Sequence, residues 1–103
     1  MAKLYCLFDT IGEESGPIFE ARNDAMARRI YDQLTDLPPG ATKADFKLLK
    51  LGSYYHGDQT KMPQLYALSK AYDITHINQK VLDKIAEEEE NAVDVAVSDN
   101  KSA

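Results

Sequence analysis

The chain has 103 residues, a length that allows one domain and excludes a second. Apolar residues make up 44% of it, so its body should pack into a core rather than remain disordered. Cys6 is the only cysteine, which excludes an intramolecular disulfide and the cysteine-rich pattern of small secreted domains. No apolar run approaches the ~20 residues of a membrane-spanning helix, so we expect a cytoplasmic protein with no membrane partner.

The charge of the chain is unevenly distributed. The formal net charge is -5, yet residues 1–86 contain eleven acidic and eleven basic residues. The six acids of residues 87–103 are offset only by Lys101. The overall acidity therefore belongs to the C-terminal segment and does not argue against a nucleic-acid partner for the rest.

Two strands are predicted at the N-terminus. Residues 3–9 alternate Leu4, Cys6 and Phe8 with Lys3, Tyr5 and Leu7, which is strand periodicity. Residues 10–16 are polar and contain two glycines, as expected of a connection, and residues 17–22 form a second short strand.

A helix is predicted over residues 24–36. Asn23 and Asp24 are good helix openers, and Asp24 stands four residues before Arg28, which favours an ion pair. Pro38 and Pro39 end the helix. Its apolar face is predicted to hold Met26, Ala27, Ile30, Tyr31 and Leu34.

The longest predicted strand covers residues 45–55. Simple alternation places Phe46, Leu48, Lys50 and Tyr54 on one face and Lys47, Leu49, Leu51 and Tyr55 on the other. Both faces are therefore partly apolar, which indicates a strand between two layers or one that offers a surface to a partner. Gly52 is a candidate for a bulge that exchanges the two faces, and residues 56–60 form a turn.

The C-terminal part is predicted to be helical. Residues 61–72 fit both helical and strand spacing, and we favour a helix. A further helix, capped by Thr75 and running to about Glu88, carries the apolar stripe Ile74, Ile77, Val81, Leu82 and Ile85. The expected fold is α+β: a small antiparallel sheet packed against one or two helices in a single domain, residues 1–86, followed by a disordered acidic tail, residues 87–103.

No pattern of catalytic or metal-binding residues is present in the sequence. His56 and His76 are far apart and lack a nearby cysteine, and the acidic groups around Asp9 and Glu87 fit a loop and a helix end. Nucleophile motifs, phosphate-binding glycine loops and zinc-protease motifs do not occur. We therefore expect no enzyme, no cofactor and no metal.

Basic residues are interleaved with tyrosines on the predicted strands. Single-stranded nucleic acid is held by cations that follow its backbone and by flat side chains on which bases stack. The candidate nucleic-acid-binding residues are Lys3, Tyr5, Arg22, Lys47, Lys50 and Tyr54.

The order of these segments resembles a known family. Residues 5–9, 16–24 and 45–54, which read YCLFD, GPIFEARND and DFKLLKLGSY, are similar to the small non-structural protein of gokushovirus-type microviruses, which are single-stranded DNA bacteriophages. The resemblance covers about residues 3–70, and the chain departs from it at Tyr55 and in its long C-terminal segment. It implies a phage protein, made in the cytoplasm of the infected bacterial host, with a DNA-binding role in viral genome synthesis.

The sequence therefore predicts two alternative functions. In the first, the chain is a non-enzymatic accessory protein, expected to be a homodimer, that binds single-stranded DNA during replication or packaging. Its acidic tail would occupy the cationic groove or recruit phage replication or capsid proteins. In the second, the chain is a protein–protein adaptor or assembly factor that uses the apolar residues 48–51 and binds no nucleic acid.

Overall fold

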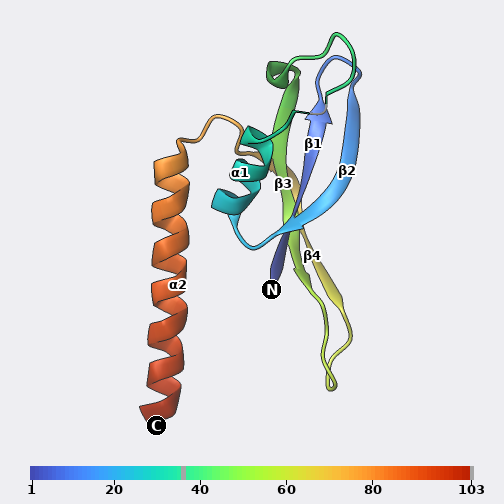
Figure 1. The fold of residues 1–103 in the computed structure, drawn as a ribbon. Helices are drawn as coiled ribbons and strands as arrows, with labels where there is room; N and C mark the ends of the chain where they lie inside the picture. Colours follow the sequence, from blue (N-terminus) through green and yellow to red (C-terminus); the bar gives the residue numbers. More distant parts are fainter. Residues whose placement is uncertain (36, 103) are drawn as a thin grey trace.

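The protein forms one four-stranded antiparallel sheet with both helices on one side of it (Figure 1). This computed structural model describes residues 1–35 and 37–102, with side chains described as far as residue 90. The strand order is β2-β1-β3-β4. The elements are β1 Ala2–Asp9, β2 Glu14–Ala21, α1 Asp24–Asp32, a 3-10 turn Lys43–Asp45, β3 Phe46–Tyr55, β4 Gln64–Asp73 and α2 Gln79–Ser102. The predicted α+β class is confirmed.

Helix α1 covers the central strands. Its first turn is capped by Asn23, whose side-chain oxygen accepts from the Met26 N–H at 2.9 Å. The helix ends at Asp32, four residues before the predicted end. Its buried positions are Ala25, Ala27 and Tyr31, so the small alanines face the protein interior, while Met26 and Ile30, predicted to be core, are exposed.

The core lies between α1 and the sheet. Its buried members are Tyr5, Ala27, Tyr31, Leu48 and Ile74, with partly buried apolar side chains around them. Ile74 donates its N–H to the Leu48 carbonyl at 3.0 Å, and the Leu48 N–H donates to the Thr75 hydroxyl at 2.8 Å. These hydrogen bonds therefore hold the β4–α2 connection against β3.

The expected cap at Thr75 is wrong because its hydroxyl is used in that connection. Helix α2 begins at Gln79, and Asn78 accepts from the Lys80 N–H at 2.8 Å. The expected Asp24–Arg28 pair is also not formed. Arg28 pairs with Asp32 at 3.2 Å and donates to the Ile77 carbonyl, which binds α1 to the same connection.

Residues 64–73 form strand β4, so the predicted helix over residues 61–72 is wrong. The strand pairs with β3, but its residues 68–71 lie opposite Leu51 alone. This bulge breaks the two-residue period and gives Leu65, Leu68 and Tyr72 their helix-like spacing. Every residue of β4 is exposed, because no described element packs on this edge strand.

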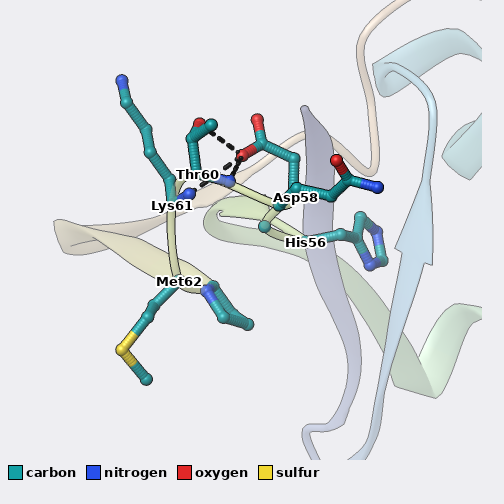
Figure 2. Close-up of a pocket in the computed structure, with 8 residues that line it drawn as sticks. His56, Asp58, Thr60, Lys61 and Met62 are labelled. Carbon is teal, nitrogen blue, oxygen red and sulfur yellow. Dashed lines mark hydrogen bonds between the residues drawn. The ribbon is translucent and has the colours of Figure 1, made fainter.

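The β3–β4 loop turns around Asp58 (Figure 2). The Asp58 carboxylate accepts from the N–H groups of Thr60 and Lys61, at 2.7 and 2.9 Å, and from the hydroxyls of Tyr55 and Thr60. These donors hold the pKa of Asp58 below its usual value, the Tyr55 hydroxyl contributing most. The local bonds return the chain antiparallel to β3, which is why it continues as a strand.

The expected acidic tail falls mainly on residues 91–103, whose side chains lie outside the described part of the chain. Helix α2 itself continues to Ser102, past its predicted end near Glu88. Within the described residues, no helix combines the length and apolar character needed to cross a bilayer.

Replacing Gly52 by alanine should destabilise the sheet. A Cβ at Gly52 would lie 2.3 Å from the Tyr66 carbonyl oxygen and 2.9 Å from the Ala67 Cα, both backbone atoms of β4. We expect the free energy of unfolding to fall by about 1–3 kcal/mol in urea denaturation. Gly12→Ala is the control, because its Cβ would meet only the movable Asp9 side chain. Equal losses in the two variants would contradict this packing.

Candidate nucleic-acid interface

The sheet has two chemically different faces, which the strand register defines. Residues paired across antiparallel strands project to the same face. Tyr5 is paired with Phe19 and Lys50, and these residues lie on the helix-side face together with Lys3, which is paired with Ser53. The residues that alternate with them, such as Leu4 and Cys6, lie on the opposite face.

The six candidate residues are divided between these faces. Lys3, Tyr5 and Lys50 lie on the helix-side face, and Arg22 directly follows β2. Lys47 and Tyr54 belong to the opposite face, paired with Phe8 and Ala2. Lys47 lies opposite to Lys50 by simple alternation, as predicted. Tyr54 is separated from Lys50 because the register shifts at Leu51, next to the bulge anticipated at Gly52, so the placement of Tyr54 with Lys50 by simple alternation is wrong.

Tyr5 cannot act as a stacking platform. Its side chain is fully buried, its ring stacks on Phe19 at 5.8 Å, and its hydroxyl donates to Asp24 at 2.5 Å. Burial, followed by the contact with Asp24, raises the pKa of Tyr5 far above its usual value. A lone strand pattern does not reveal that the helix covers this side chain, and the predicted role of Tyr5 in base stacking is therefore wrong.

Three of the four predicted cations are paired with carboxylates. Lys50 lies 3.3 Å from Asp24 on α1, and both side chains are mostly buried. Lys3 lies 3.2 Å from Glu89, and Arg22 lies 3.1 Å from Glu90. Two successive acids of α2 therefore neutralise cations from two different parts of the sheet.

The Lys3–Glu89 and Arg22–Glu90 pairs line a hollow of about 510 Å³ between the sheet and α2. Its lining is Met1, Lys3, Arg22, Asn23, Ala86, Glu89 and Glu90. A carboxylate beside a cation occupies the place that a phosphate group would take, because both are anions that accept hydrogen bonds from ammonium and guanidinium groups. In this structure the acids of α2 take that place beside Lys3 and Arg22.

Two exposed tyrosines that the sequence reasoning did not select lie on the same face. Tyr66 is paired with Ser53, which is itself paired with Lys3, and Tyr72 is paired with Lys50. Their exposed fractions are 49% and 57%. The sequence signal for this strand was the alternative strand spacing of residues 61–72, over which a helix was favoured.

The remaining polar features of the described residues are an aromatic contact of His56 and a second hollow around the Asp58 turn. The His56 ring packs edge-on against Tyr54 at 5.0 Å and lies 3.2 Å from Glu20. A second hollow of about 490 Å³ surrounds residues 56–63, but Asp58 is fully engaged by its own turn (Figure 2). Within residues 1–35 and 37–90, no group of three or more metal-ligating side chains occurs.

Comparisons with protein-family models, with curated proteins and with solved structures found no match. The geometry of the site keeps Lys3 and Arg22 as candidate contacts and adds Tyr66 and Tyr72. It places Lys50 in a mostly buried pair with Asp24, and it separates Lys47 and Tyr54 from the other candidates.

Tyr5→Phe should change how stability depends on pH. The folded protein keeps the Tyr5 proton at a pH where an unfolded tyrosine, of pKa about 10, has lost it, so the free energy of unfolding falls as the pH rises above about 10. In the variant, the free energy of unfolding measured by urea denaturation should decline less steeply between about pH 9 and pH 11. It should also lose about 0.5–1.5 kcal/mol at neutral pH with the bond to Asp24.

Tyr54→Phe is the matched control, because it removes a hydroxyl from the opposite face and should keep the wild-type decline. If the free energy of unfolding of Tyr5→Phe declined as steeply above pH 9 as that of the wild type, the Tyr5 hydroxyl would not be held as described.

Proposed function

We propose that the protein is a non-enzymatic binder of single-stranded DNA whose contact surface is the helix-side face. The cations are Lys3 and Arg22, and the stacking side chains are Tyr66 and Tyr72. The observation that carries the proposal is the pairing of Lys3 and Arg22 with Glu89 and Glu90, which stand side by side on α2.

The acids of α2 act in this proposal as an internal competitor for the DNA backbone. The pairs they form are partly exposed, and exposed ion pairs contribute only about 0.2–1 kcal/mol each, so phosphates can displace them. The core contact of α2 is Leu82, which precedes the acids, so the helix end can move without opening the core. Binding is then suppressed until an extended polyanion competes.

The exposed tyrosines would add base stacking to the phosphate contacts of the cations. Tyr66 is aligned with Lys3 across the sheet, and Tyr72 lies on the same face of β4, so a strand whose phosphates contact Lys3 can direct bases towards β4. Stacking tolerates any base, which suits binding without sequence preference. Duplex DNA keeps its bases stacked inside and would gain little from these rings.

The sequence resemblance supports the same class of partner. A microvirus protein of this kind would act in the cytoplasm of the infected bacterium during single-stranded genome synthesis or packaging. The rival adaptor function keeps only part of its original surface, because Leu48 is fully buried while Leu49 lies on the opposite face of the sheet. What remains available to that rival function is the opposite face of the sheet.

Removing the two competing acids should strengthen DNA binding. Glu89→Gln with Glu90→Gln abolishes both ion pairs and should tighten binding of an oligothymidine about two- to tenfold at low salt, measured by fluorescence anisotropy. With two cations engaged, the logarithm of the binding constant should fall with the logarithm of salt concentration with a slope of about -1.4.

The matched control is Glu87→Gln with Glu88→Gln, which removes the same charge from α2 and leaves the two described pairs intact. Equal gains in the two double variants would indicate a general charge effect and contradict the competitor role. Absence of binding at low salt in both would overturn the proposed function.

Removing the exposed rings should weaken binding. Tyr66→Leu and Tyr72→Leu keep apolar bulk but lose the flat surface for a base, and each should reduce affinity for single-stranded DNA about fivefold or more. Tyr54→Leu removes a ring from the opposite face and should leave affinity unchanged. If Tyr54→Leu alone weakened binding, the DNA would lie on the wrong face for this proposal.

A further inference from the structure

An apolar hollow lies on the helix-side face beyond the end of α1. The helix ends at Asp32, and Leu34 and Leu37 belong to the loop that follows it. Together with Leu7 and Phe46 of the central strands, these leucines line a hollow of about 240 Å³. Leu7, Leu34 and Phe46 are partly buried side chains packed against the core cluster. The core is therefore open to the surface at this end of the sheet.

The rim of this hollow is acidic. Asp9 and Glu14, which are paired across β1 and β2, line it, and Glu13 precedes Glu14 in the turn. The Asp9 carboxylate accepts from the backbone N–H groups of Ile11 and Gly12, at 2.9 and 3.1 Å, and not from a cation. Within residues 1–35 and 37–90, none of the three carboxylates forms an ion pair, and no lysine or arginine lines the hollow. The charge that would balance this rim is a cation from another molecule.

The volume of the hollow suits a single side chain. Free small ligands occupy pockets of about 300–1,000 Å³ that enclose most of their surface. This hollow is smaller, and it is bordered by Ser15 and Pro17 of the edge strand β2, both of which are exposed. Protein interfaces concentrate their binding energy on a few large side chains seated in pockets of this kind. The geometry therefore favours an anchor residue of a protein over a free ligand.

We propose that the hollow and its acidic rim are the docking site for a short segment of another protein, which carries a large apolar residue next to lysine or arginine. The apolar residue enters the hollow against Leu37 and Phe46. Its basic neighbours meet the carboxylates of Asp9, Glu13 and Glu14. Complementary charges at a rim speed the encounter and exclude partners of the wrong charge, so an acidic segment is rejected here.

The outer edge of β2 adds little to this recognition. An exposed edge strand can accept an additional strand through its backbone groups. Pro17 has no N–H group to offer, and the β1–β2 register shifts between Cys6 and Phe8, next to this part of β2. A continuous ladder is therefore interrupted, and docking depends on the anchor residue and on the charges of the rim.

The docking site is separate from the proposed DNA-contact surface. Lys3 and Asp9 stand six residues apart on β1, which is about 20 Å at the rise of a strand. The acidic rim also repels phosphate groups. The partner segment and single-stranded DNA should therefore bind at the same time.

Panning a displayed library of random heptapeptides on the full chain tests the proposal. The enriched peptides should share a large apolar residue next to lysine or arginine. A synthetic copy of an enriched peptide, measured by fluorescence anisotropy, should bind Leu37→Ser at least about fivefold more weakly, because this variant makes the hollow polar. Leu65→Ser is the matched control, because Leu65 lies on β4 and is 61% exposed, and it should leave the affinity unchanged.

Charge reversal tests the role of the rim. Glu14→Lys should weaken binding of the basic peptide about tenfold, and a peptide with glutamate in place of its basic residue should bind this variant better than it binds the wild type. Glu87→Lys makes the same charge change on α2, away from the hollow, and is the control that should leave the affinity unchanged. Circular dichroism of each variant confirms its fold.

The absence of enriched peptides, enrichment of peptides without basic residues, or equal losses in variants and controls would overturn the proposal. Displacement of the peptide by oligothymidine would place it on the DNA-contact surface and also overturn it. Self-association of the full chain in sedimentation equilibrium that is abolished by Leu37→Ser would make a second copy the occupant, which contradicts a partner segment. The panning and peptide titrations contain no DNA, so their failure is distinct from a failure of the proposed function.

Discussion

The carboxylate of Asp24 connects helix α1 to the sheet, and the arrangement of both faces depends on it. It accepts the Tyr5 hydroxyl and pairs with Lys50, so the first turn of α1 is fixed above the two central strands. An acidic side chain at a helix N-terminus is also favourable to the helix dipole. Through this contact α1 covers Tyr5, which is fully buried, while the edge strand β4 stays exposed.

Two surfaces of different chemistry result. The helix-side face combines cations, acids of α2 and the exposed tyrosines of β4, which suits an anionic strand with accessible bases. The opposite face combines apolar side chains with the charges of Glu20, Lys47 and Asp73.

The sequence was sufficient to predict elements whose signals are local. Alternation predicted β1 and β3, the short polar side chain of Asn23 marked the start of α1, and Gly52 marked the bulge. The prediction failed where a tertiary contact determined the outcome. The Thr75 hydroxyl accepts a hydrogen bond from the Leu48 N–H and does not cap a helix. Residues 61–72 fit two periodicities, and the pairing of β4 with β3 selected the strand.

The candidate site was predicted only in part for the same reason. The cations were identified, but a strand pattern does not show which face the helices cover, so Tyr5 was assigned a surface role and Tyr66 and Tyr72 were missed. The partners of Lys3 and Arg22 lie on α2, far along the chain, and only the fold brings Glu89 and Glu90 to them.

The most direct test of the central claim is a map of backbone amide shifts in nuclear magnetic resonance spectra as oligothymidine is added to the full chain. The account predicts that the shifts concentrate at Lys3, Arg22, Tyr66 and Tyr72 and along α2 at Glu89 and Glu90. The amides of Ile18 and Leu49, on the opposite face, should not move. Shifts centred on Ile18 and Leu49, or no shifts at low salt, would contradict it.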